Sequence, residues 1–243
     1  LLLIASDREA AESAAQANEA HESLCLLERA ASVPNMARAL LNVARNKGAA
    51  GVDGRGVEEV VEASRLLLPK LRRELLEGTY QPGYIRRVWI PKPGGRGQRG
   101  LGITNVVDRC VQQCVLQVLE PIFDPTFHNS SHGFRTNRGA QTAIAEAKRY
   151  VEEGFNWSVD IDLSKFFDRV NHQRLLNRLA QQVDDGRVLT LVHRMLKAKV
   201  VLPDGTRVSM KEGTMQGVPL SPLLSNVVLD ELDWELDRRG LRF

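Results

Sequence analysis

The segment Trp157–His172, WSVDIDLSKFFDRVNH, constrains this chain more than any other stretch. Two apolar residues alternate with Asp160 and Asp162, which is the period of a β-strand, so both carboxylates are predicted to project from one face. A strand that ends in acidic residues and leads into a Phe-Phe pair can hold a hard cation beside a shaped pocket. The alternative is a strand whose last Asp caps the next helix. The segment alone leaves both interpretations open.

Three further blocks accompany this segment. They are VWIPKPGGRGQRGLGITNVVDRCVQQCVLQVLEPIFDPTF (Val88–Phe127), SHGFRTNRGAQTA (Ser131–Ala143) and GTMQGVPLSPLLSNVVLDELD (Gly213–Asp233). In this order and spacing the blocks resemble the reverse transcriptases encoded by bacterial group II introns, from about Val33 to Phe243. Several blocks in one order are more specific than any single motif.

The resemblance implies an α+β chain with the right-hand polymerase fold. Helical fingers with a β-hairpin are expected over residues 33–155, and an incomplete palm with a split β-α-β pattern over residues 156–243. Residues 1–32 form a separate N-terminal helical extension in this division. The family carries a Tyr-Ala-Asp-Asp hairpin after its long helix, and we expect the sequence to stop just before it, as a fragment of a longer protein.

The resemblance also assigns the chemistry. Asp162 matches the first metal-binding, catalytic Asp, and Asp160 is a second metal candidate with a supporting role. Two Mg²⁺ ions, with Mn²⁺ as a substitute, would activate the primer hydroxyl and neutralise the leaving pyrophosphate. Phe166 matches the aromatic ring beneath the incoming sugar, which would favour dNTPs, whereas Phe167 is expected to pack in the core. His172 is expected to be a structural contact.

The remaining candidates are nucleotide- or template-binding residues. Gln216 and Gly217 would line the nascent base pair, although Met215 replaces the Pro that is usual before them. Lys92 and Arg86 match positively charged fingers positions. Arg109 follows Asp108, which is expected to hold it in place. The stretch GLGITN, residues 100–105, departs from the usual Arg-Pro-Leu-Gly-Ile-Pro-Thr.

The charge distribution points to nucleic acid. The net charge is +3, but residues 1–32 carry −4, so the remainder carries +7. Residues 81–107 contain five cations and no acid, which is typical of a phosphate-binding surface. A solvated basic loop is the alternative. The five cations are Arg86, Arg87, Lys92, Arg96 and Arg99.

Periodicity and capping signals predict the elements. Strands are expected at 84–90 and within 157–162, and a hairpin at 200–208 turns about Pro203-Asp204-Gly205. Asn105 is expected to cap the helix that follows it. Helices are predicted over 6–30, 34–47, 57–76, 105–119, 139–153, 172–181, 187–197 and 221–239.

The expected partners are an RNA template and primer, dNTPs and intron RNA. The three cysteines are predicted to be free thiols in a cytoplasmic protein, and no apolar run is long enough for a membrane span. Two other functions remain open: a non-catalytic RNA-binding or maturase module, and a retron or diversity-generating reverse transcriptase. The fragment itself is expected to be inactive alone. The sequence does not predict the oligomeric state.

Overall fold

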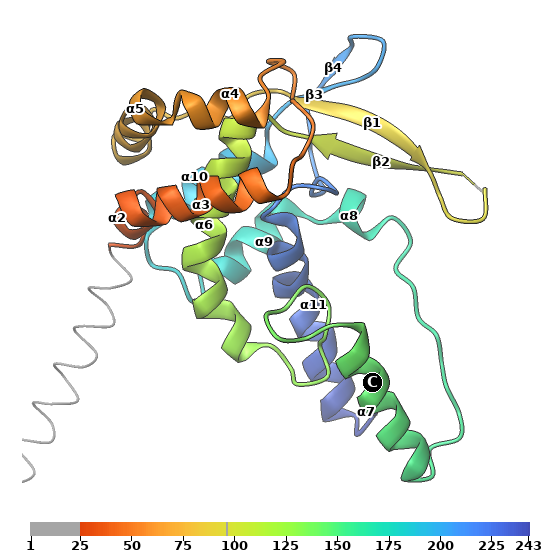
Figure 1. Ribbon diagram of the computed structural model, residues 1–243. Helices are drawn as coiled ribbons and strands as arrows, with labels where there is room; N and C mark the ends of the chain where they lie inside the picture. The colour runs from red at the N-terminus through yellow and green to blue at the C-terminus, as the bar shows by residue number, and fades with distance from the viewer. Residues whose placement is uncertain (1–24, 96) are drawn as a thin grey trace, which may run out of the picture.

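The computed structural model describes residues 25–95 and 97–243. Within them, short helices and a projecting sheet lie at one end, and α6, α11 and α7 extend toward the other (Figure 1). The chain is therefore mixed α+β, as predicted. Residues 6–24 of the helix predicted over 6–30 lie outside the described residues.

Four helices open the described part: α2 (Leu26–Ala30), α3 (Val33–Arg45), α4 (Val57–Glu62) and α5 (Ser64–Leu76). The Ser32 side chain accepts a hydrogen bond from the Asn35 amide, and Pro34 occupies the first turn, so α3 begins where these signals predict. The single helix predicted over 57–76 is wrong, because it breaks at Ala63. The break lets each half turn its own apolar residues, such as Val60 and Leu71, inward.

The sheet has four strands in the order β2-β1-β3-β4. The predicted first β-hairpin is confirmed: β1 (Ile85–Pro91) pairs antiparallel with β2 (Gln98–Ile103). We call this pair of strands the ribbon. The predicted second hairpin is also found, as β3 (Val200–Val201) and β4 (Arg207–Val208). The parallel pairing of Ile85 with Val200 joins the two hairpins into one sheet.

The other helices are α6 (Val106–Phe123), η1 (Asp124–Thr126), α7 (Ala140–Glu152), α8 (Phe166–Arg169), α9 (His172–Leu179), α10 (Gly186–Leu196) and α11 (Ser221–Arg238). The predicted helices after residue 100 are all present, with shifted ends. Asn105 stands at the N-cap of α6, but its side chain makes no capping bond. The side-chain oxygen of Asn105 accepts from the Asp53 amide instead, so that capping prediction is wrong.

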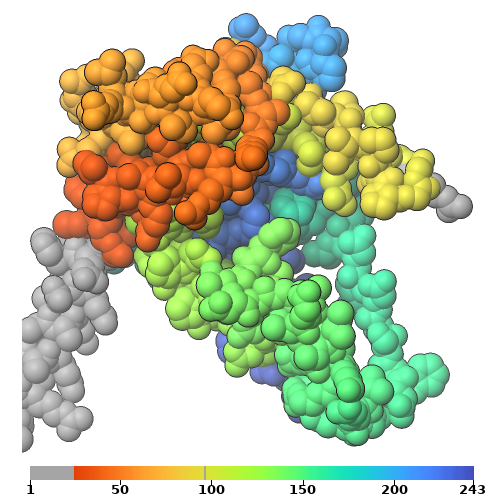
Figure 2. Space-filling view, viewed as in Figure 1, coloured from red at the N-terminus to blue at the C-terminus, as the bar shows by residue number. Residues whose placement is uncertain are grey.

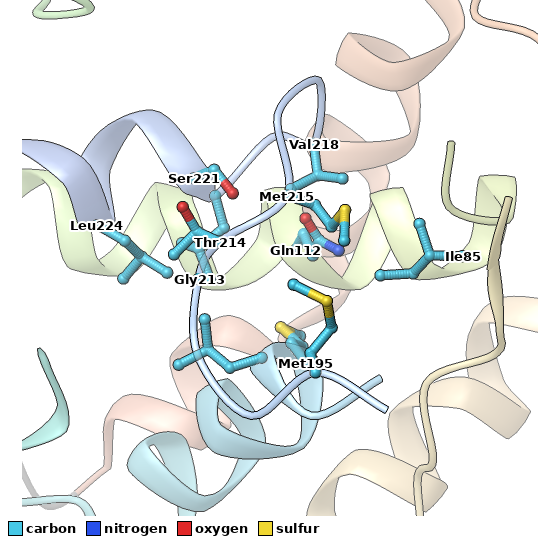
Figure 3. Close-up of a pocket in the computed structure, with 12 residues that line it drawn as sticks. Ile85, Gln112, Met195, Gly213, Thr214, Met215, Val218, Ser221 and Leu224 are labelled. Atoms are coloured by element: carbon cyan, nitrogen blue, oxygen red, sulfur yellow. The ribbon is translucent and has the colours of Figure 1, made fainter. Parts of the chain in front are cut away.

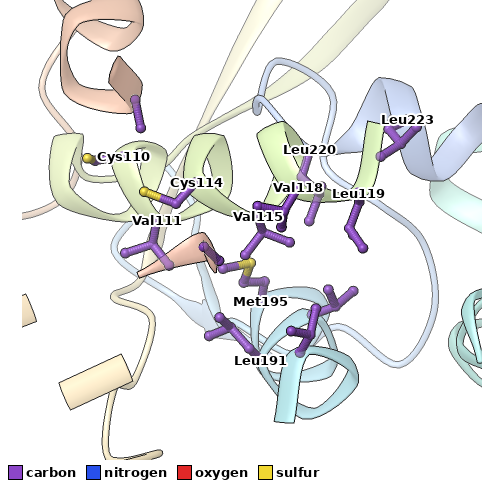
Figure 4. Close-up of a cluster of buried hydrophobic side chains, with 14 of the residues drawn as sticks. Cys110, Val111, Cys114, Val115, Val118, Leu119, Leu191, Met195, Leu220 and Leu223 are labelled. Carbon is purple, nitrogen blue, oxygen red and sulfur yellow. The ribbon is translucent and has the colours of Figure 1, made fainter. Parts of the chain in front are cut away.

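One apolar core holds these helices together. Val111, Val115 and Leu119 of α6 meet Leu191 of α10 and Leu223 of α11 (Figure 4). The same cluster runs from Leu26 to Val227, so it crosses the boundary expected near residue 155. Burial of apolar surface is the main stabilising contribution to such a core.

Residues 25–32 pack against this core. The α2 side chains Leu26 and Leu27 are buried. The Leu27 amide donates to Asp185, which also caps α10. Arg187 bridges Asp185 to Glu28 of α2. The described part of the predicted N-terminal extension therefore packs as part of the same body.

The strand predicted within residues 157–162 is wrong. Residues 155–163 have no regular secondary structure, and the Trp157 side chain is 96% exposed. A strand requires a partner for its backbone groups. The four strands of the described sheet pair with one another and leave none beside this segment. Figure 2 shows open space between it and the neighbouring helices.

Candidate functional site

Asp160 and Asp162 lie on the exposed, irregular segment before α8. Asp162 is exposed, but it does not end a strand. The alternative of a helix cap is also wrong: Lys165, in the left-handed region, occupies the N-cap of α8 and makes no side-chain capping bond. The described residues contain no group of three or more His, Cys, Asp or Glu side chains that could hold a metal ion.

The aromatic pair that follows is partly buried. The Phe166 and Phe167 rings meet edge to face at 5.5 Å. Phe166 packs against the main core, and Phe167 is not among the residues that do. This reverses the expectation that Phe167 is the packing ring of the pair. The backbone of α8 begins with a bond from the Phe166 amide to the Leu163 carbonyl.

Three hydrogen bonds join α8 and α9 to the loop that carries Gln216. The Thr214 amide donates to Phe167 O over 2.6 Å, and the Gly213 amide donates to Val170 O over 2.7 Å. His172 Nε2 donates to Gly213 O over 2.7 Å. His172 is therefore a structural contact, as predicted. These hydrogen bonds connect the loop at residues 213–218 to residues 167–172.

Gly213 is required at this junction. Its φ is +90°, and a Cβ there would lie 2.9 Å from the carbonyl oxygens of Phe167 and Asp168. Only glycine adopts this conformation without strain and permits such close approach. Gly217 also has a positive φ, of +94°, but more space around it. The conformation and the contact distances thus mark Gly213 as the more constrained of the two.

Gln216 contacts β2 through its backbone. Its carbonyl oxygen accepts from the Gly102 amide over 2.9 Å. Met215, which departs from the family pattern, is buried with Ile85 and Val200 in a small second apolar cluster. A Cβ on Gly102 would lie 2.8 Å from the Met215 sulfur, so this thioether packs directly on β2.

Arg86 and Arg109 converge on one loop. Arg86 donates to Ala50 O over 2.7 Å, and Arg109 donates to the neighbouring Ala49 carbonyl. The expectation that Asp108 holds Arg109 is wrong. Asp108 instead accepts bonds from the Tyr80 hydroxyl and the Gly83 amide. Both guanidinium groups thus hold the residue 49–50 backbone, a role that their charge alone does not predict.

The rest of the basic cluster lies on the ribbon. Lys92 and Arg99 are exposed, and Arg96 lies outside the described residues. Arg87 stacks 5.5 Å from the centre of the half-exposed Trp89 ring and donates to Gly100 O. The exposed cations are thus free to meet phosphates, whereas Arg86 and Arg87 also hold backbone carbonyls.

Burial raises the pKa of two hydrogen-bonded groups, the Asp108 carboxyl and the Tyr80 hydroxyl. Burial raises the pKa of the Asp108 carboxyl, and hydrogen bonds from Tyr80 and Gly83 act in the opposite direction. Burial and the Asp108 charge raise the pKa of the Tyr80 hydroxyl well above its ordinary value. Their partnership spans 28 positions in the chain, and no local motif indicates it.

Cys110 and Cys114 are buried free thiols, as predicted, and Cys25 is free and half-buried. Among the described residues, no helix combines the length and the hydropathy of a membrane span.

Comparison with known proteins identifies the family. A family model described as reverse transcriptase (RNA-dependent DNA polymerase) matches residues 90–242. Protein YkfC of Escherichia coli is 39% identical over 79% of this chain and 51% of its own length. The group II intron-encoded protein LtrA of Lactococcus lactis is 34% identical over 68% of this chain and 27% of its own length.

A solved structure described as "Partial Cas6-RT-Cas1--Cas2 complex" superposes with a TM-score of 0.56 at 23% identity. The superposition covers 88% of this chain and 35% of that one. That likeness supports the fold alone.

The chain belongs to the reverse transcriptase family, because the family model matches more than half of its residues. Within that family it is of the group II intron type, as its similarity to the intron-encoded relatives shows. It spans about half the length of YkfC and about a quarter of LtrA.

The donor chemistry of Asp160 and Asp162 fits a divalent metal, since Mg²⁺ prefers carboxylate oxygens. These two residues would hold it, and the bound metal would stabilise charge on the reacting oxygens. Asp162 is exposed to an incoming ion. In the described residues the two carboxylates stand without a third acidic, His or Cys ligand.

Proposed function

We propose that this chain is the fingers and palm portion of an RNA-directed DNA polymerase of group II intron type. Fingers would span residues 33–155 and palm residues 156–243, after an extension over residues 1–32. The full-length enzyme would synthesise DNA from dNTPs on an RNA template, with Mg²⁺ and in the cytoplasm. It would also assist the splicing and mobility of its intron RNA.

The junction between α8 and the loop at residues 213–218 carries this proposal. It fastens Phe166, which would lie beneath the sugar, to the loop of Gln216 and Gly217, which would line the base pair. Asp162 precedes Phe166 by one short turn. The proposed sugar-binding and base-binding groups therefore belong to one connected structure, and the proposed metal-binding Asp162 lies on the exposed segment that leads into it.

Primer extension on an RNA template tests the polymerase activity. Residues 1–243 should extend poorly or not at all, and a longer version that includes a Tyr-Ala-Asp-Asp hairpin should be active, because two carboxylates do not organise two metals. In that version Asp162→Asn should abolish extension. Asp168→Asn, at an exposed position of α8, is the control. Robust extension by residues 1–243 would contradict the requirement for further ligands.

Sugar choice tests the role of Phe166. In the active version, Phe166→Ala should admit rNTPs, because the ring would no longer exclude a 2′-hydroxyl. Phe167→Ala is the matched control and should leave sugar choice unchanged. Since Phe166 also packs on the core, melting curves must accompany the assay. Unchanged rNTP discrimination with a large loss of stability would assign Phe166 to packing alone.

RNA binding by the ribbon is a second candidate function, and the acid-free basic cluster favours it. Lys92→Ala with Arg99→Ala should reduce the salt dependence of RNA binding by about two units of slope. Arg65→Ala with Arg72→Ala, on α5 away from the ribbon, is the charge-matched control. A slope that falls equally in both pairs would indicate non-specific attraction.

A further inference from the structure

Eight buried polar side-chain atoms make no hydrogen bond within residues 25–95 and 97–243. Three of the eight belong to residues that line small cavities. They are Gln112 Oε1, Thr214 Oγ1 and Thr104 Oγ1. The exposed fractions of these residues are 6%, 3% and 3%. Buried polar atoms in folded proteins nearly always have a partner, either in the protein or in ordered water. Each of these three therefore requires an explanation.

Two adjoining cavities meet these atoms. The larger, of about 30 Å³, is lined by Gln112, Thr214 and the buried Ser221, together with methionine and other apolar side chains (Figure 3). The smaller, of about 10 Å³, is lined by Gln112 and Thr104. Gln112 borders both cavities, so α6 contributes a polar group at the point where they adjoin.

The size and chemistry of the larger cavity decide what it holds. A water molecule needs roughly 10–15 Å³ of such volume and two to four polar partners. The larger cavity exceeds this volume and offers the Gln112 carbonyl and the Thr214 hydroxyl, with Ser221 on the same wall. We infer that Gln112 and Thr214 bind a structural water molecule between α6 and the loop at residues 213–218.

This water adds a tether that the protein atoms alone do not supply. The backbone of the loop is held by α8, by His172 and by β2. The Thr214 side chain borders the same cavity as Gln112 on α6. The water would thus connect the loop to the helix at the centre of the core. If the proposed function holds, this tether also helps to position Gln216 for the incoming nucleotide.

Water-selective nuclear Overhauser spectroscopy on residues 1–243 tests the site without any requirement for polymerase activity. A long-lived water should give cross-peaks to the Thr214 methyl group and to the Gln112 side-chain amide. Gln113, the next residue of α6 and half-buried, provides the internal control and should show none. The absence of these cross-peaks at Thr214 and Gln112 would overturn the inference.

Near-isosteric substitutions give an independent test. Gln112→Met and Thr214→Val should each lower Tm by about 3 to 8 °C, because each leaves the water and the remaining group short of a partner. The double variant should lose less than the sum of the two, since no polar group then remains unpaired. Gln113→Met is the matched control. A rise in Tm for Gln112→Met would mean that the cavity is dry, and additive losses would mean that the two groups share no water.

Discussion

His172 Nε2 donates a hydrogen bond to the carbonyl oxygen of Gly213 over 2.7 Å, across 41 positions of the chain. The bond joins the start of α9 to the loop that carries Gln216. His172 is buried, so its replacement removes a partner from an interior carbonyl group.

His172→Leu should lower the free energy of unfolding by about 1–3 kcal/mol, because it leaves the Gly213 carbonyl without its donor. His172→Gln places an amide donor at similar reach and should recover much of this loss. Urea unfolding of both variants measures the effect. Equal losses in the two variants would show that ring packing matters and the hydrogen bond does not.

Stability should also depend on pH through His172. Burial lowers the pKa of this imidazole below its ordinary value near 6.5, with further lowering from Lys197 and His193, whereas the Gly213 carbonyl and Glu212 act oppositely. The unfolded chain therefore takes up the proton first as pH falls. The contribution is complete above about pH 6.5 and is lost as pH falls through the folded pKa. Unfolding titrations should show this loss in the wild type and a smaller one in His172→Gln.

Gly213→Ala should be more damaging than Gly205→Ala. Both glycines have positive φ, +90° and +85°, so the conformational strain is similar. Only at Gly213 would the added methyl group lie 2.9 Å from backbone oxygens, whereas nothing lies within 4 Å at Gly205. We expect about 1 kcal/mol or more of loss at Gly205 and a clearly larger one at Gly213. Similar melting temperatures for the two variants would contradict the close approach.

Tyr80→Phe should cost about 1.5–3 kcal/mol, because Asp108 is buried and loses one of its two principal donors. Tyr150→Phe is the matched control: its hydroxyl donates to Glu146 in a more accessible place and should cost much less. Asp108→Asn should be milder than Asp108→Leu, since the amide oxygen still accepts a bond. Thermal melting of the four variants decides between these outcomes.

Local signals predict much of the fold. Ser32 and Pro34 mark the start of α3, and the strand predicted over residues 84–90 is found as β1. The strand expected at residues 157–162 is wrong, because a two-residue period describes side chains and does not supply a pairing partner. Val159 and Ile161 remain exposed where the pattern predicts alternating burial.

The candidate site is harder to predict from the sequence than the fold is. Asp162 is exposed without the strand that the alternating pattern predicts. The junction between Phe167 and Thr214 is made by backbone groups, which residue type does not indicate. The burial of Gln112 Oε1 is likewise not predicted by the sequence, because a Gln in an amphipathic helix is typical of a surface position. Roles that depend on distant backbone require the three-dimensional arrangement.

The parallel pairing of Ile85 with Val200 sets an order of events when the chain is made. Val200 is synthesised about 115 residues after Ile85, which at roughly 5–20 residues per second takes about 6 to 23 s. During that interval β1 and β2 form an isolated two-stranded ribbon, which is marginally stable in water. Its open edge is available to other chains, and β3 later covers only the end of that edge, at Ile85 and Arg86.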